Sequence, residues 1–175
     1  MGKTGKGIIQ VERKMQILIL ALFLSACSDS RVAPESRDLN FKFGYGVGAK
    51  NVLNTFEDTF TKDLILDGTT TVSFFLSDEE LHQIRNKIDE IAFFSYPDTF
   101  VAVTADSISR YVDPYATYDF EVKKDSTIKH VAWKDAIINQ NTQALKLREL
   151  ISLIRTVIES KPEYSKLPAA KGGYL

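Results

Sequence analysis

The sequence feature that most constrains the fold is an apolar run near the amino terminus. It leads to the only cysteine of the chain, and it decides which residues belong to the folded domain. Residues Ile17–Leu24 are all apolar and lead through Ser25 and Ala26 to Cys27. Basic residues precede the run, namely Lys3, Lys6, Arg13 and Lys14. A basic start, an apolar run of about 7–15 residues and small residues before a cut form a secretory signal. The run is too short for a transmembrane helix, which needs about 20 apolar residues. The pattern therefore predicts that residues 1–26 are an export signal outside the folded domain.

Two alternative interpretations of this segment stay open. Translation could start at Met15, although no basic residue would then precede the apolar run. Residues Ile17–Phe23 could instead form a buried strand or helix, with Cys27 as a small core residue, because free cysteine is often buried. The polar stretch Ser28–Asn40 that follows favours the signal, since it has the composition of a tether.

The end of the signal resembles the lipobox of bacterial lipoproteins. Leu24-Ser25-Ala26-Cys27 fits the pattern Leu-(Ser/Ala)-(Ala/Gly)-Cys at every position. The resemblance implies that the Cys27 thiol carries a diacylglyceryl group, that the signal is cut before Cys27, and that the new amine can also be acylated, for example with palmitate. We therefore expect a lipidated cysteine and flexible tether over residues 27–38, and one domain over residues 39–175. The predicted location is the cell membrane, lipid-anchored and facing outside the cytoplasm.

The charge of the exported part excludes some partners. Cleavage before Cys27 removes 26 of 175 residues, with four Lys or Arg and one Glu, so 149 residues remain and the net charge changes from −1 to −4. This length suits a single domain with a real core. A mildly acidic domain without a basic cluster is a poor nucleic-acid binder, and we expect no nucleic-acid partner. With Cys27 acylated, no thiol is left for a disulfide.

Alternating side chains predict strands on both sides of a central helix. The period of two is clearest over Leu39–Val47, less clean over Leu53–Leu66, and strong over Thr69–Leu76. Asp67-Gly68 has the composition of a hairpin turn. Two further strands are expected at Tyr118–Lys123 and Thr127–Trp133, joined at Lys124-Asp125.

Two amphipathic stretches predict helices. Ser77 and Glu80 have the spacing of a capping box at the start of the first helix, and Pro97 lies beyond its end. The second helix begins after Asn139 or Asn141 and ends at Pro162. The order βββαββα predicts an α+β domain, with an antiparallel sheet of about five strands and two helices packed on one face.

The exported domain also resembles a group of uncharacterised lipoproteins from Gram-positive bacteria. The stretches that carry the resemblance are residues 42–63, 76–81 and 146–175. The resemblance implies a surface lipoprotein without known activity, and it transfers no site residue.

Several patterns suggest chemistry, but a structural interpretation is stronger for each. Ser126-Thr127-Ile128-Lys129 has the Ser-x-x-Lys spacing of penicillin-binding enzymes but lies in an expected hairpin. The glycines at 44, 46 and 48 lead from one strand to another, whereas a phosphate-binding loop leads into a helix. Two histidines, His82 and His130, and the dispersed Asp113, Asp119 and Asp125 do not predict a metal site. We expect no cofactor, no metal and no assignable catalytic residue.

The remaining candidate is an aromatic cluster around the ambiguous stretch Pro97–Pro114. Tyrosine is common at partly hydrated contact surfaces, because its ring is apolar and its hydroxyl is polar. A ligand or an envelope protein could therefore bind a surface that runs from Pro97 to Tyr118. The residues of the cluster are Tyr96, Phe100, Tyr111, Tyr115 and Tyr118. Alternatively, these rings belong to the core and rim of a β-rich domain. We therefore predict a non-enzymatic binding or interaction module. The alternatives are an envelope hydrolase that acts on cell-wall or glycan material through two carboxylates, and a structural spacer.

Overall fold

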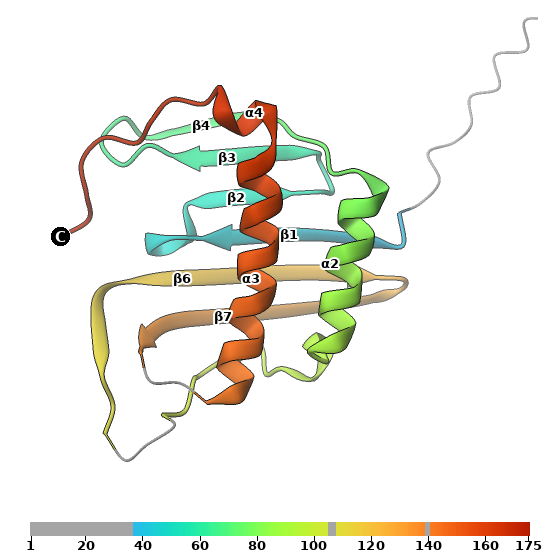
Figure 1. The fold of residues 1–175 in the computed structure, drawn as a ribbon, viewed down its shortest axis with the longest axis vertical. Coiled ribbons are helices and arrows are strands. Elements are labelled where there is room, and N and C mark those ends of the chain that lie inside the picture. The colour runs from blue at the N-terminus through green and yellow to red at the C-terminus, as the bar shows by residue number, and fades with distance from the viewer. Residues whose placement is uncertain (1–36, 105–107, 139–140) are drawn as a thin grey trace, which may run out of the picture. The chain divides into compact units, whose positions relative to one another are not determined.

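Alternating apolar and polar side chains build one seven-stranded sheet in the computed structural model, which describes residues 37–104, 108–138 and 141–175. Three helices and two short 3-10 turns complete the fold, and the last two helices follow the final strand (Figure 1). In chain order the elements are β1 (Leu39–Tyr45), η1 (Val47–Ala49), β2 (Asn51–Asn54), β3 (Thr59–Asp63), β4 (Thr69–Ser73), α2 (Asp78–Glu90), η2 (Phe93–Ser95), β5 (Thr99–Phe100), β6 (Tyr111–Lys124), β7 (Thr127–Ile137), α3 (Thr142–Ser160) and α4 (Pro162–Ser165). The predicted export signal, the predicted lipidation site Cys27 and most of the predicted tether lie outside the described residues.

The prediction of a five-stranded antiparallel sheet is wrong. The spatial order is β4-β3-β2-β1-β6-β7-β5, and β5 runs parallel to β7 while all other neighbours are antiparallel. The sheet is therefore mixed, and a third helix, α4, follows the two that were expected. The missing strands arise in two places: the expected strand Leu53–Leu66 is a hairpin of two strands, and β5 adds an edge strand of two residues.

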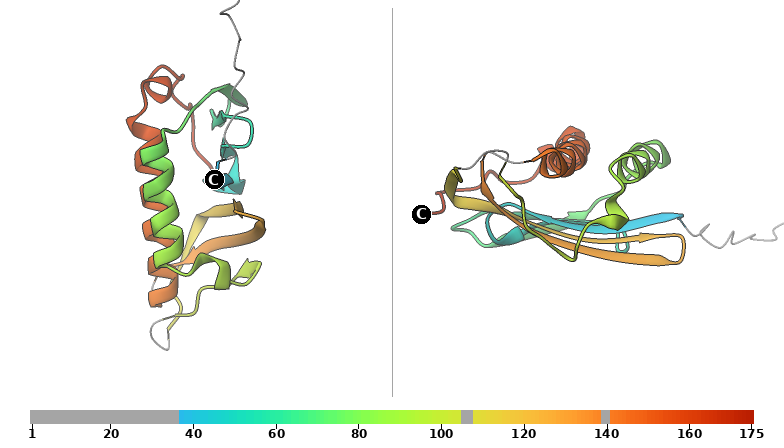
Figure 2. Two further views of the ribbon diagram at one scale, coloured as in Figure 1. Left: turned by 90° about the vertical axis from the view of Figure 1, so that its right-hand side faces the viewer. Right: turned by 90° about the horizontal axis from the view of Figure 1, so that it is seen from below.

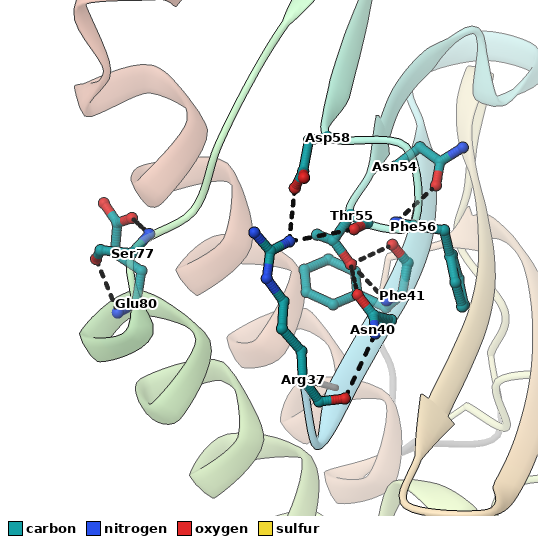
Figure 3. Close-up of polar contacts among 9 residues, drawn as sticks. All are labelled: Arg37, Asn40, Phe41, Asn54, Thr55, Phe56, Asp58, Ser77 and Glu80. Carbon is teal, nitrogen blue, oxygen red and sulfur yellow. Dashed lines mark hydrogen bonds and ion pairs between the residues drawn. The ribbon is translucent and has the colours of Figure 1, made fainter. Parts of the chain in front are cut away.

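The hairpin between β2 and β3 was missed because side chains, rather than glycine or proline, make its turn (Figure 3). The Thr55 hydroxyl accepts a hydrogen bond from the Phe41 N–H at 2.7 Å and donates to the Phe41 carbonyl at 3.1 Å. The Asn54 side chain accepts from the Phe56 N–H at 3.1 Å, as in an Asx turn. Arg37 forms an ion pair of 2.6 Å with Asp58, which adopts a left-handed φ of 50°. Arg37, assigned to the tether from sequence, thus belongs to the fold.

The second half of the sheet starts earlier than its pattern suggested. β6 begins at Tyr111 rather than Tyr118. Its register against β7 shifts between Tyr111 and Ala116, so more residues lie on β6 than on β7 over this span. This irregular segment contains Pro114 and bends away from the flat part of the sheet (Figure 1). The bend explains why the sequence of this segment shows no clean period.

Both expected helices lie side by side on one face of the sheet and cross its strands (Figures 1 and 2). The capping box at Ser77 and Glu80 is confirmed, since each side chain accepts a hydrogen bond from the other residue's N–H. The Asn141 side chain accepts from the Ala144 N–H at 3.1 Å and caps α3. Pro162 follows the end of α3 and begins α4.

A continuous apolar core fills the space between the sheet and the two helices. The covered face of the sheet supplies mainly aromatic rings, including Phe43, Phe120 and Trp133, and the helices supply mainly leucine and isoleucine. Phe43 stacks on Phe120 with ring centroids 4.6 Å apart. No helix of the described residues lies on the opposite face of the sheet (Figure 2). Among the residues described, none of the helices is long and apolar enough to span a membrane.

Candidate binding groove

A groove runs along the side of α3 that faces away from α2, because the strands are longer than two helices can cover. β7 has 11 residues, which extend to roughly 36 Å, whereas two packed helices cover only about 20 Å. The carboxyl end of β1 and the adjoining part of β6 therefore project past α3 (Figure 1). No further helix of the described residues covers the inward-facing side chains of this part of the sheet. They lie beside a polar stripe of α3.

Two adjoining hollows make up this groove. The first encloses about 360 Å³ between β1, β2, β3, β6, α3 and the carboxyl-terminal tail. The second encloses about 460 Å³ along α3 and reaches Asp135 on β7. Tyr118, Arg155 and Glu159 line both, so the two hollows adjoin. The combined size is in the range of sites for small organic ligands.

Three tyrosine hydroxyls in the groove have no hydrogen-bond partner in the described part of the chain. They belong to Tyr45 at the end of β1, Tyr118 on β6 and Tyr164 on α4. A fourth tyrosine, Tyr174 in the tail, donates its hydroxyl to the buried carboxylate of Asp63. A tyrosine hydroxyl that packs among protein atoms usually finds a partner. The three free hydroxyls can therefore each donate to and accept from a bound molecule.

The charges that line the groove balance one another. Arg148 makes two hydrogen bonds to the buried Asp135 carboxylate, from Nε at 3.0 Å and from Nη2 at 2.7 Å. Arg155 donates to Glu159 at 2.9 Å, and its guanidinium lies 5.7 Å from the centre of the Tyr45 ring. The buried Asp135 carboxylate orients Arg148, whereas the Arg155–Glu159 pair is exposed and places both charges along the groove.

A lysine and a tyrosine form the opposite wall. The Lys62 ammonium lies 4.8 Å from the centre of the Tyr164 ring and has no carboxylate partner among the described residues. Asp63 accepts hydrogen bonds from the Ile65 N–H and from Tyr174. The first hollow thus holds two cations, Lys62 and Arg155, and two carboxylates, Asp63 and Glu159.

Burial changes the acidity of the groove tyrosines. Desolvation raises the pKa of Tyr45 far above its ordinary value, and the neighbouring Tyr164 adds to the shift. Burial likewise raises the pKa of Tyr118, with a smaller contribution in the same direction from the Asp135 carboxylate. The pKa of Tyr164 is raised by burial and by Glu159. The three phenols are therefore neutral at physiological pH and act as hydrogen-bonding groups.

The structure separates the aromatic residues that the sequence grouped together. Tyr96 and Phe100 are buried in the core, where the Tyr96 hydroxyl donates to the Gln143 carbonyl at 2.9 Å. Tyr111 is exposed on the irregular part of β6, and Tyr115 is half-buried in the same segment. Of the five, only Tyr118 lines the groove.

Of the other sequence candidates, only Gly46 lines this groove, at the rim of its first hollow. Ser126 lies in the turn between β6 and β7, and Lys129 pairs with Asp98 rather than with a serine. The glycine run turns the chain from β1 into β2, and the left-handed φ of Gly46 and Gly48 fits that turn. His82 lies on α2 and His130 on β7. Within the described ranges, no three or more His, Cys, Asp or Glu side chains lie close enough to hold a metal ion.

Sequence reasoning missed Tyr45, Tyr164, Arg155 and Lys62 as groove residues. Tyr45 carries a usable signal, because a tyrosine that ends a strand face otherwise made of leucine and phenylalanine keeps a polar group at the rim of the core. Arg148, Ser152, Arg155 and Glu159 recur at helical spacing beside the apolar face of α3, which also marks them as one stripe. That the stripe faces strand ends rather than open solvent follows only from the fold.

Comparison with family models, with curated proteins and with solved structures finds no match to this chain.

Proposed function

We propose that this protein is a lipoprotein of the bacterial cell envelope, anchored through Cys27, whose domain binds a ligand in the groove beside α3 without chemically altering it. The groove is the observation that carries the proposal. It places three free phenol hydroxyls beside charged side chains of both signs in two adjoining hollows. The lipobox-like sequence at residues 24–27 supports the location.

The lining favours an uncharged, hydroxyl-rich ligand such as a glycan. Sugar hydroxyls both donate and accept hydrogen bonds, as the hydroxyls of Tyr45, Tyr118 and Tyr164 do. A highly charged polymer would need a strong electrostatic field of the opposite sign. The first hollow has no such field, because its positive and negative charges balance. Two adjoining hollows suit a chain of sugars better than a single compact molecule.

The alternative of a glycan hydrolase receives less support. Asp135 and Glu159 in the groove are each engaged by an arginine. On the uncovered face of the sheet, Asp119 and Glu121 share a smaller hollow with Lys42 and His130. These two carboxylates point the same way from one strand, so a substrate would lie over both instead of between them. We therefore propose binding rather than hydrolysis.

The anchor is tested by labelling cells with a clickable palmitate analogue and then fractionating them. The wild-type chain should be labelled and recovered with the membrane, because two or three acyl chains anchor a domain firmly. The Cys27→Ala variant should lose the label and leave the membrane fraction. An unlabelled wild-type chain in the cytosol would contradict the proposed location.

The groove is tested by sedimentation of the mature protein, solubilised in mild detergent, with purified insoluble cell-wall glycan. The variants Tyr45→Phe, Tyr118→Phe and Tyr164→Phe keep the rings and remove only the hydroxyls. Each lost hydrogen bond should weaken binding by roughly 3- to 10-fold. Tyr111→Phe, in the exposed segment of β6, is the matched control and should bind like the wild type. Equal binding by all variants would exclude the groove as the site.

A further inference from the structure

The outermost strand β4 presents an open backbone edge. β4 lies at one end of the strand order and pairs only with β3 (Figure 1). Hydrogen-bonded pairs alternate along an antiparallel ladder. The Phe74 N–H donates to the Asp58 carbonyl at 2.7 Å, and the Leu64 N–H donates to the Gly68 carbonyl at 2.8 Å. Given the register of the two strands, these two bonds mean that Thr70 and Val72 bond to β3. The backbone N–H and C=O groups of Thr69, Thr71 and Ser73 therefore point away from β3.

The sequence of β4 has none of the features that usually prevent strand pairing. Sheet edges are commonly blocked by charged side chains, proline, bulges or very short strands. At the opposite end of the strand order, the last strand β5 has only two residues. β4 has five residues, Thr-Thr-Thr-Val-Ser, without a charge, a proline or a glycine. In the described part of the chain, no backbone group bonds to its outer side.

The edge is also complementary to itself. In an antiparallel pairing of two copies around a two-fold axis at Thr71, Thr69 of one copy faces Ser73 of the other, and every outward N–H meets an outward C=O. No like charges face each other along the strand. Phe75 follows β4 and Leu66 precedes it, and their side chains are 60% and 76% exposed. The two-fold axis places Phe75 of one copy near Leu66 of the other copy. Apolar groups at both ends of the edge would thus be covered in the pair.

We propose that β4 is a homodimer interface, through which two copies of this chain join their sheets antiparallel across a two-fold axis at Thr71. The interaction does not involve the groove beside α3, which opens on the helix-covered face of the sheet. It relies on backbone hydrogen bonds supplemented by the exposed apolar side chains at either end.

The full chain carrying Cys27→Ala, which has no other cysteine, is examined by sedimentation equilibrium over a range of concentrations. We expect a concentration-dependent dimer. Thr71→Pro removes an N–H that points outward, so it leaves the β3–β4 ladder intact but should weaken the dimer at least about tenfold. Thr71→Val keeps the backbone donor and should dimerise like the parent. Circular dichroism checks that each variant is folded.

A second pair of variants keeps the test decisive if Thr71→Pro fails to fold. Thr71→Lys places two like charges across the axis and should give a folded monomer. Thr71→Cys should be joined into a covalent dimer by a short bismaleimide crosslinker, because the axis brings the two thiols together. A folded parent that stays monomeric at all concentrations, or a dimer that survives both Thr71→Pro and Thr71→Lys, would overturn the proposal.

Discussion

A single buried hydroxyl decides how one part of this chain turns. Thr55 is only 2% exposed, and its hydroxyl bonds to both backbone groups of Phe41. The same bonds continue the pairing of β1 past the point where β2 ends. A buried backbone N–H that loses its acceptor retains the full cost of desolvation.

Thr55→Val should therefore destabilise the fold by about 1–3 kcal/mol, although valine has nearly the same shape. The free energy of unfolding, measured by urea titration, checks this. Thr61→Val is the control: the Thr61 hydroxyl bonds the Thr71 hydroxyl on the uncovered face, at 2.8 Å, where water can replace it. Equal losses for the two variants would mean that the bonds to Phe41 do not hold the turn.

At the scale of elements, one carboxylate links the start of α2 to the end of α3. Glu80 accepts from the Ser77 N–H at 2.7 Å and from the Lys161 ammonium at 2.6 Å. Burial alone would raise the pKa of Glu80, but the bonds from Lys161 and Ser77 outweigh it and lower that pKa below its ordinary value. A carboxyl group whose pKa is lowered in the folded state stabilises the fold at pH values above its ordinary pKa. That stabilisation is lost as the pH falls through the folded-state pKa.

Glu80→Gln should lower the free energy of unfolding at neutral pH by about 1 kcal/mol, since the amide keeps the cap but loses the charge. The difference from the wild type should shrink as the pH falls below about 4.5, the ordinary glutamate value. Urea titrations at several pH values measure it. Glu79→Gln provides the control, because Glu79 lies in the same first turn and contacts Gln83 instead of a lysine. A pH-independent difference would show that the charge of Glu80 is not involved.

The elements also show which parts of the fold sequence patterns can predict. Both long helices, the Asp67-Gly68 turn and the Lys124-Asp125 turn are set by local chemistry, such as caps and left-handed residues, and local chemistry is visible in the sequence. The turn at Thr55 depends on Arg37 and Phe41, which are distant in the chain, and β5 forms only because β7 lies beside it. The groove likewise depends on strand lengths relative to helix positions, so Tyr118 was identified but its neighbours were not.

At the scale of the whole molecule, one core connects the sheet to both helices. The buried cluster runs without interruption from β1 through α2, β6 and β7 to α3. Trp133, the only tryptophan, is 1% exposed within it and packs against Phe100 and Tyr118. If the helices and the sheet separated, the apolar faces of both would be exposed to water. We therefore expect the described domain to unfold in a single cooperative step.

Trp133 emission reports the loss of the core, and far-UV circular dichroism reports the loss of the helices and strands. In urea the two signals should have the same midpoint for the full chain carrying Cys27→Ala. Leu150→Ala removes a fully buried side chain from α3 and should cost about 2–5 kcal/mol. Because the core is shared, this change should move both midpoints together. If the helix signal moved and the Trp133 signal did not, α3 would unfold independently, and the wall of the groove that it supplies would be only intermittently present.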